Sequence, residues 1–297
     1  MKHAFLVIFC SALFAPASVQ ANDSAKTIAT LKQVYDVWRQ SMVTKNAKSW
    51  QKYTSQNKQI NVRNRLWSER IRFPDGVFRV PGAPPSIANL KPISVRVNKN
   101  TAKSVYFGKV DFGVGGEPTD NLYVISYILE PSGWKYDGSD FVSLNHLPQI
   151  RAQIAQGNYK FVESPDFIPD GIVPKPPVVL NAPAKYIAKV YVFCPGREVS
   201  VVANGVSKHL FQNEKTAEVV IGGAKDGKNT LSYTVKDIPG GDPKAVMTIR
   251  MYLMSEVNGR KPHKPIEYQV ENGQRPKANG TLQFNLGPDI ARYLKGK

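Results

Sequence analysis

The apolar residues near the start of the chain recur with the period of a helix. Ile28, Leu31, Tyr35, Trp38 and Met42 are separated by alternating steps of three and four residues, which places all five on one side of an α-helix. Charged and amide side chains fill many of the positions between them. The pattern predicts an amphipathic helix as the first large element of the chain.

Farther along the chain the period changes to that of a β-strand. Two shorter helices are expected at residues 49–53 and 60–71. The strands expected after them are 93–97, 102–112, 122–130 and 141–144, with a short closing helix at 147–154. Helices followed by antiparallel strands indicate an α+β domain, in which the helices cover one face of a curved antiparallel sheet.

Residues 164–183 interrupt this order with six prolines. Proline has no amide donor and disfavours helical conformation in the residue before it, so neither a helix nor a central strand is expected here. Repeated prolines give an extended, semi-rigid segment. The segment is therefore predicted to be a linker between two domains.

After the linker almost every apolar pattern is that of a strand. The expected strands are 187–193, 198–203, 218–221, 230–235, 246–254, 266–270 and 281–286. Within 248–253 every second residue is a large aliphatic one, as one buried sheet face requires. This half is predicted to be an all-β sandwich domain. The predicted organisation is a signal peptide at 1–21, an α+β cone-like domain at 22–163, a linker at 164–184 and a β-sandwich domain at 185–297.

The first 21 residues have the features of a secretory signal peptide. A short basic start precedes an apolar run at 4–14, and Val19 and Ala21 are small residues at the positions required for cleavage before Asn22. No later segment approaches the ~20 apolar residues that span a bilayer. We therefore expect an exported protein, periplasmic or extracellular. Cleavage would remove Cys10 and leave Cys194 as a single cysteine, which cannot form an internal disulfide. Because Cys194 follows an apolar strand, we expect its thiol to be buried.

Charge is distributed unevenly along the chain. The formal net charge is +17. The window from Arg39 to Lys109 contains fifteen basic residues and only two acidic ones, Glu69 and Asp75, for a formal +13. Such a density creates a field that favours an acidic partner.

Helical spacing suggests which basic residues form one face. The candidate binding face consists of Lys45, Lys48, Lys52, Arg63 and Arg70. Its expected partners are an acidic protein, an anionic glycan or an anionic surface. Nucleic acid is not expected to be the main ligand of an exported protein. The alternative interpretation is a solvated basic surface whose interleaved aromatic residues belong to the core.

Catalytic and metal-binding signals are missing from the sequence. His146, His209 and His263 are far apart and have no partner at metal-ligand spacing, so each is expected to be a surface or capping residue. No nucleophile elbow, phosphate loop or dinucleotide fingerprint occurs. The sequence predicts no catalytic residue, no metal site and no cofactor.

Part of the first half resembles a known superfamily. The long helix with Tyr35 and Trp38, the short helix at 50–53 and the sequence from Gly133 to Lys135 resemble the nuclear-transport-factor-two-like cone fold, which also includes ketosteroid isomerases. The resemblance implies a pocket at the wide end of a cone. It leaves open an isomerase-like enzyme, for which Asp111 is the candidate base and Tyr106 and Tyr123 are possible hydrogen-bond donors.

The second half resembles the jelly-roll accessory domains found beside glycosidase catalytic domains. The similarity lies at residues 202–206, 217–221 and 226–231. It implies a carbohydrate-binding accessory role for the sandwich. The function expected from the sequence is that of an exported, non-enzymatic, two-domain binding protein with a basic face. Carbohydrate binding and isomerase-like catalysis stay open as alternatives.

Overall fold

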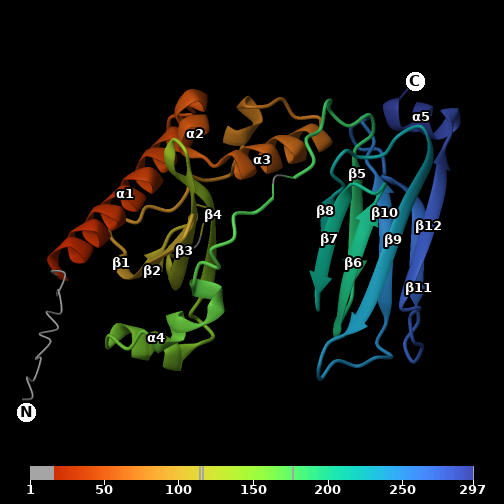
Figure 1. Ribbon diagram of the computed structural model, residues 1–297. Helices are drawn as coiled ribbons and strands as arrows, with labels where there is room; N and C mark the ends of the chain where they lie inside the picture. The colour runs from red at the N-terminus through yellow and green to blue at the C-terminus, as the bar shows by residue number, and fades with distance from the viewer. Residues whose placement is uncertain (1–16, 114, 116, 176, 297) are drawn as a thin grey trace, which may run out of the picture. The chain divides into compact units, whose positions relative to one another are not determined.

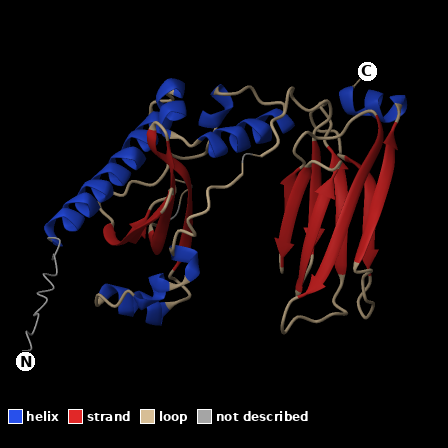
Figure 2. Cartoon of the chain, in the orientation of Figure 1, coloured by secondary structure: helices blue, strands red, loops and turns tan. Residues whose placement is uncertain are grey.

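The computed structural model describes residues 17–113, 115, 117–175 and 177–296, which form the helices and strands shown in Figures 1 and 2. The α-helices are α1 (Ala17–Val43), α2 (Ala47–Tyr53), α3 (Gln56–Ser68), α4 (Pro148–Ala155) and α5 (Pro288–Lys295). Three short 3₁₀ helices are η1 (Asp75–Phe78), η2 (Lys160–Glu163) and η3 (Pro165–Phe167). The strands are β1 (Lys91–Asn98), β2 (Thr101–Val110), β3 (Thr119–Glu130), β4 (Gly133–Ser143), β5 (Ala188–Phe193), β6 (Arg197–Ala203), β7 (Ser207–Gln212), β8 (Lys215–Val219), β9 (Gly227–Asp237), β10 (Met247–Leu253), β11 (His263–Val270) and β12 (Asn279–Leu286).

The backbone contacts divide the chain into two compact units. Unit 1 comprises the described residues up to Val43 together with Pro84–Val173, and unit 2 comprises Thr44–Ala83 together with Pro174–Lys297. The fold class is the one expected: a helix-covered antiparallel sheet and then a β-sandwich-like unit. The grouping differs from the expected boundaries in two respects. Thr44–Ala83 was expected to belong with the first sheet, and the expected linker at 164–184 is divided between the units after Val173.

Unit 1 is built on an antiparallel sheet with the strand order β1-β2-β3-β4. The helix α1 covers one face with Leu31, Val34, Tyr35 and Trp38, which are all buried. On the other face Val105, Leu122 and Val124 pack with Ile154 of α4 and Phe167 of η3. Because both faces are covered, β3 is buried almost continuously instead of at every second residue.

The first part of the proline-rich segment is bound to the sheet of unit 1. Asn98 donates from its amide to the carbonyl of Pro169 at 3.1 Å, and the amide of Gly171 donates to Thr101 Oγ1 at 3.0 Å. Together with buried Phe167, these bonds fix residues up to 171 on the sheet. This proline-rich stretch is therefore packed on the sheet, and side chains of the sheet supply hydrogen-bond partners for its backbone.

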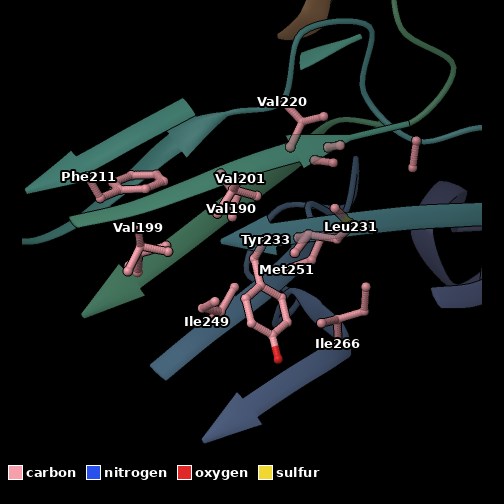
Figure 3. Close-up of a cluster of buried hydrophobic side chains, with 14 of the residues drawn as sticks. Val190, Val199, Val201, Phe211, Val220, Leu231, Tyr233, Ile249, Met251 and Ile266 are labelled. Carbon is pink, nitrogen blue, oxygen red and sulfur yellow. The ribbon is translucent and has the colours of Figure 1, made fainter. Parts of the chain in front are cut away.

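Unit 2 contains two four-stranded antiparallel sheets, ordered β11-β10-β5-β8 and β12-β9-β6-β7. Their inner faces are mainly aliphatic, because alternating positions of β5, β6, β9 and β10 supply valine, isoleucine, leucine and methionine to one core. Figure 3 shows this core, with Val190, Ile249 and Met251 facing Val199, Val201 and Phe211. Ile249, Met251 and Leu253 are at most 1% exposed, as the alternation in the sequence predicts.

The strand β7 was not expected from the sequence. Its inward positions are Ser207, His209 and Phe211, so only one of the three is apolar. A pattern read from hydrophobicity alone does not identify such a strand.

The helix α3 is tied to the second part of the proline-rich segment. Asn64 donates to the carbonyl of Val178 at 2.5 Å and accepts from the amide of Leu180 at 3.2 Å. The amide of Ala184 donates to the carbonyl of Trp67 at 2.9 Å. These bonds explain why residues 44–83 group with the sandwich, since one buried amide side chain holds both partners.

The predicted signal peptide lies mostly outside the described residues, and its last residues from Ala17 form the start of α1. No helix in the described part of the chain is long and apolar enough to cross a membrane.

Candidate functional site

The interior of unit 1 holds a chain of hydroxyl groups between α1 and the sheet. Tyr35 donates to the carbonyl of Pro85 at 2.6 Å, and its oxygen lies 3.0 Å from the hydroxyl of Tyr123. The Ser139 hydroxyl lies 3.0 Å from that of Tyr123 and 3.1 Å from that of Tyr136. Burial is the main cause that raises the pKa of Tyr35, Tyr123 and Tyr136. These hydroxyl groups therefore satisfy one another.

Aromatic packing fills this interior. Trp38 stacks on Tyr136 with 3.6 Å between ring centroids, and Tyr35 lies 5.6 Å from Trp38. Asp111, the candidate base, is exposed, and its Oδ1 accepts from the amide of Gly113 at 2.7 Å. No aspartate or glutamate is among the buried residues that the structure describes. The described interior thus offers packing and hydrogen bonds, and none of its fully buried side chains is a carboxylate.

The five residues of the predicted basic face have different surroundings. Lys45 and Lys48 are exposed, whereas Lys52 lies with its ammonium 5.6 Å from the ring centroid of Tyr53. Arg63 lies 4.8 Å above the ring of Trp67 and donates to the Leu180 carbonyl at 3.4 Å. Arg70 forms an ion pair with Glu256. Two of the five are therefore engaged in holding unit 2 together, and anion binding by the group stays a prediction.

Two pockets lie in unit 2. One, of about 280 Å³, is lined by Lys45, Ala47, Asp75, Phe78 and Arg79. The carboxylate in this lining is already paired, because Asp75 lies 3.3 Å from Arg72. The other, of about 350 Å³, lies between turns and is lined mainly by glycine, proline and aliphatic residues. The first pocket thus combines the basic groups of Lys45 and Arg79 with a carboxylate that is already paired, and the charged residue in the lining of the second is Asp242.

A Ser–His–Glu arrangement links the two sheets of the sandwich. His209 Nε2 lies 2.7 Å from Ser207 Oγ, and its Nδ1 lies 2.6 Å from Glu218 Oε2. An ionised carboxylate only accepts, so Nδ1 carries a proton and, in neutral imidazole, Nε2 accepts from the serine. Ser207 Oγ in turn accepts from the amide of Ile221 at 2.7 Å. The order of contacts is that of a hydrolase triad.

Burial gives this arrangement a structural role. Ser207 is 1% exposed, and its oxygen already accepts the Ile221 amide. A nucleophile must reach a substrate carbonyl, which this serine does not. His209 was expected to be a surface or capping residue and is instead buried, where Ser207 and Glu218 satisfy both ring nitrogens. The three residues tie edge strand β7 to edge strand β8.

The outer side of the sheet β11-β10-β5-β8 carries the most developed candidate site. Tyr191 and Phe193 alternate with buried Val190 and Val192 on β5, and Tyr252 alternates with buried residues on β10. The three rings therefore project from one sheet face, and each is partly exposed. We call Tyr191, Phe193 and Tyr252 the aromatic face.

Each ring of the aromatic face has a basic residue directly opposite it on the neighbouring strand. The cross-strand pairs are Tyr252 with Lys189, Tyr191 with Arg250 and Phe193 with Lys215. Side chains in such pairs are neighbours, about 5 Å apart at Cβ. Successive pairs are two residues apart along the strands, about 7 Å. The result is three parallel ring-and-cation rows.

A hydrogen-bond network holds the central row. Arg250 lies 5.7 Å from the ring centroid of Tyr191, and its Nε donates to Glu267 Oε1 at 2.6 Å. Hydrogen bonds from Lys264 and Arg250 lower the pKa of Glu267, so this carboxylate stays ionised and anchors the guanidinium. Gln269 adds an acceptor 3.5 Å from Arg250 Nη2.

The described residues contain no group of three histidine, cysteine, aspartate or glutamate side chains that could hold a metal ion. Cys194 is buried, and burial raises the pKa of its thiol.

No protein-family model and no curated protein matches this chain. Among solved structures it is similar to a pair of C2 domains of extended synaptotagmin 2, with 10% identity over 61% of this chain and 75% of that chain. The TM-score of 0.14 is too low for that similarity to carry an argument about fold or function.

Sequence reasoning identified the strands that carry the aromatic face but not the face itself. The signal was present in the alternation of Arg250 and Tyr252 with buried aliphatic residues. Pairing across strands was needed to bring β5 beside β10.

Proposed function

We propose that this chain is an exported, non-enzymatic binding protein that holds a polysaccharide on the aromatic face. The observation that carries the proposal is the projection of Tyr191, Phe193 and Tyr252 from one sheet face, beside the hydrogen-bonding groups of Arg250 and Gln269.

The chemistry of a sugar ring fits such a surface. A pyranose has a face of C–H groups and a rim of hydroxyl groups, so it stacks on the electron-rich face of an aromatic ring while its rim forms hydrogen bonds. Tyrosine adds a phenol hydroxyl at the edge of the contact. Rings repeated along a flat sheet suit a chain molecule better than a compact one.

The local structure keeps the rings accessible. Ala217, the residue opposite Tyr191 on β8, is exposed and too small to cover the ring. The polar side chains beside the rings bond to one another. Among the described residues, the hydrogen bonds and ring contacts of Arg250, Glu267 and Gln269 are with side chains of the same sheet face, with Lys264 and with Glu271 just beyond β11. Large aromatic side chains left partly exposed without a covering element are typical of binding surfaces.

The test is retention of the intact protein on a panel of insoluble neutral and acidic polysaccharides. Tyr191→Ala and Tyr252→Ala are each expected to weaken binding about tenfold, the scale of one aromatic contact. Phe141→Ala is the matched control, because Phe141 is an aromatic residue of unit 1 that is 56% exposed.

Circular dichroism of each variant establishes that it is folded. Retention on no polysaccharide would overturn the proposal. An equal loss of binding in Phe141→Ala would also overturn it, because exposed aromatic surface in general would then be responsible.

A further inference from the structure

We infer that the polysaccharide bound by the aromatic face is acidic, with one negative group placed beside each ring-and-cation row. This inference rests on the proposed function and names the class of its ligand. The observation behind it is separate from the rings: each of the three rings lies directly opposite a cation.

Two of the three cations have no anionic partner. Among the described residues neither Lys189 nor Lys215 forms an ion pair or a side-chain hydrogen bond, and each is paired across the strands with an aromatic residue, Tyr252 and Phe193. A flexible lysine side chain that starts opposite a ring can reach a carboxylate or sulfate carried by a sugar stacked on that ring. Such charge-assisted bonds are stronger than those between neutral groups.

The third cation is held in a fixed orientation. Glu267 accepts from Arg250 Nε at 2.6 Å and is shared with Lys264. The guanidinium has a second contact on the same side of the sheet, because Nη2 lies 3.5 Å from Gln269 Oε1. A preorganised guanidinium loses little freedom on binding a planar carboxylate.

The charge of the whole face agrees with an acidic ligand. It includes four basic side chains, Lys189, Lys215, Arg250 and Lys264, against Glu267 and, just beyond β11, Glu271. The excess is positive, and Glu267 is occupied by two of the cations. A neutral glycan would accept hydrogen bonds from these cations but would not neutralise their charge, because it offers hydroxyl groups only.

Repeated rings and cations would also suit a single-stranded nucleic acid, in which bases stack and phosphates are neutralised. The predicted export signal favours a glycan. The experiment therefore includes both ligands.

The probes are polygalacturonate and its fully methyl-esterified form, which have the same backbone with and without charge. The intact protein is expected to bind polygalacturonate at least about tenfold more tightly. That preference should weaken about tenfold from about 50 to about 200 mM salt, as expected for release of counterions from a few ion pairs. The double variant Lys189→Gln/Lys215→Gln should lose most of the preference and keep its affinity for the esterified form.

The control is Lys208→Gln/Lys228→Gln, which removes the same charge from exposed positions on the other sheet. It should bind as the unmodified chain does. Equal affinity for both forms would overturn the acidic inference and leave the proposed function standing.

Binding to neither form nor to any polysaccharide of the panel would overturn the proposed function itself. Tighter binding of a single-stranded DNA oligonucleotide than of polygalacturonate would overturn the inference in favour of nucleic acid.

Discussion

Two groups of aromatic residues in this protein have opposite surroundings. In unit 1, Tyr35, Trp38 and Tyr136 are buried between a helix and a sheet, where Trp38 stacks on Tyr136 and Tyr35 lies tilted beside Trp38. In unit 2, Tyr191 and Tyr252 project from the outer side of a sheet and are partly exposed. The first group has its hydroxyl groups joined in one network, whereas the second lies beside cations. Aromatic content alone therefore does not mark a binding site; the partners of each ring do.

The comparison also predicts that substitutions in the two groups affect different properties. Rings that pack on one another should matter for stability, and rings that face outward should matter for binding. Four predictions test this division.

The largest effect is expected from alkaline pH. Burial is the main cause that raises the pKa of Tyr35, Tyr106, Tyr123, Tyr127 and Tyr136 above the usual 10. The folded chain keeps these protons above pH 10 while the unfolded chain releases them. The contribution of these tyrosines to the free energy of unfolding is therefore fully present below pH 10. As the pH rises from 10 towards the pKa of the folded chain, it falls by about 1.4 kcal/mol per pH unit for each tyrosine.

The sandwich has fewer such groups. Burial raises the pKa of Tyr233 to about 12 and also raises that of Tyr186. Unit 1 should therefore unfold at a lower alkaline pH than unit 2, measured by tyrosinate absorbance together with circular dichroism. Unfolding of both units at the same pH would contradict this predicted difference between them.

Truncation of the buried tryptophan should come next. Trp38→Ala removes a ring that is 7% exposed and stacked on Tyr136. We expect a loss of about 3–5 kcal/mol in the free energy of unfolding, from lost burial and the remaining cavity. Urea unfolding followed by circular dichroism measures it, and Phe141→Ala serves as the exposed aromatic control. A cost below about 1 kcal/mol would mean that the interior is loosely packed.

A smaller effect is expected from one hydroxyl group. Tyr35→Phe leaves the ring in place but removes the donor to the Pro85 carbonyl and the contact with Tyr123. The expected cost is about 1–3 kcal/mol, because buried acceptors lose their partner. Tyr252→Phe on the aromatic face is the comparison and should cost less than about 0.5 kcal/mol, as is usual at the surface. An equal loss in the free energy of unfolding for the two variants would contradict the distinction between the buried hydroxyl network and the aromatic face.

The smallest effect is expected at the exposed lysines of α2 and the turn before it. Lys45→Gln/Lys48→Gln should change the free energy of unfolding by less than about 0.5 kcal/mol. Retention on an anionic column should fall less than for Lys189→Gln/Lys215→Gln, because Lys189 and Lys215 share one sheet face with Arg250 and together give it a higher positive charge density. The opposite order would favour the basic face predicted from the sequence over the aromatic face.

Local patterns in the sequence were sufficient for most elements. The step of three and four residues that contains Leu31, Tyr35 and Trp38 reflects one buried side of α1, and these three residues are buried. The alternation in β10 reflects one buried sheet face. Both patterns arise because burial repeats with the geometry of the element itself, so they can be read without knowing the partner.

Contacts between distant residues decided the rest. The strand β7 escaped prediction because Ser207 and His209 face inward, which is tolerated only because Glu218 of β8 and the Ile221 amide complete their hydrogen bonds. In the predicted basic face, Arg70 is ion-paired with Glu256, a residue 186 positions farther along the chain.

The sequence by itself therefore determined most of the secondary structure, the fold class and the excess of positive charge. The tertiary structure alone decided which aromatic rings are enclosed and which cations adjoin exposed rings. The physical reason is that periodicity depends on a residue's own element, whereas a ring's exposure and a charge's partner depend on strands paired across long stretches of chain, as β5 is with β10.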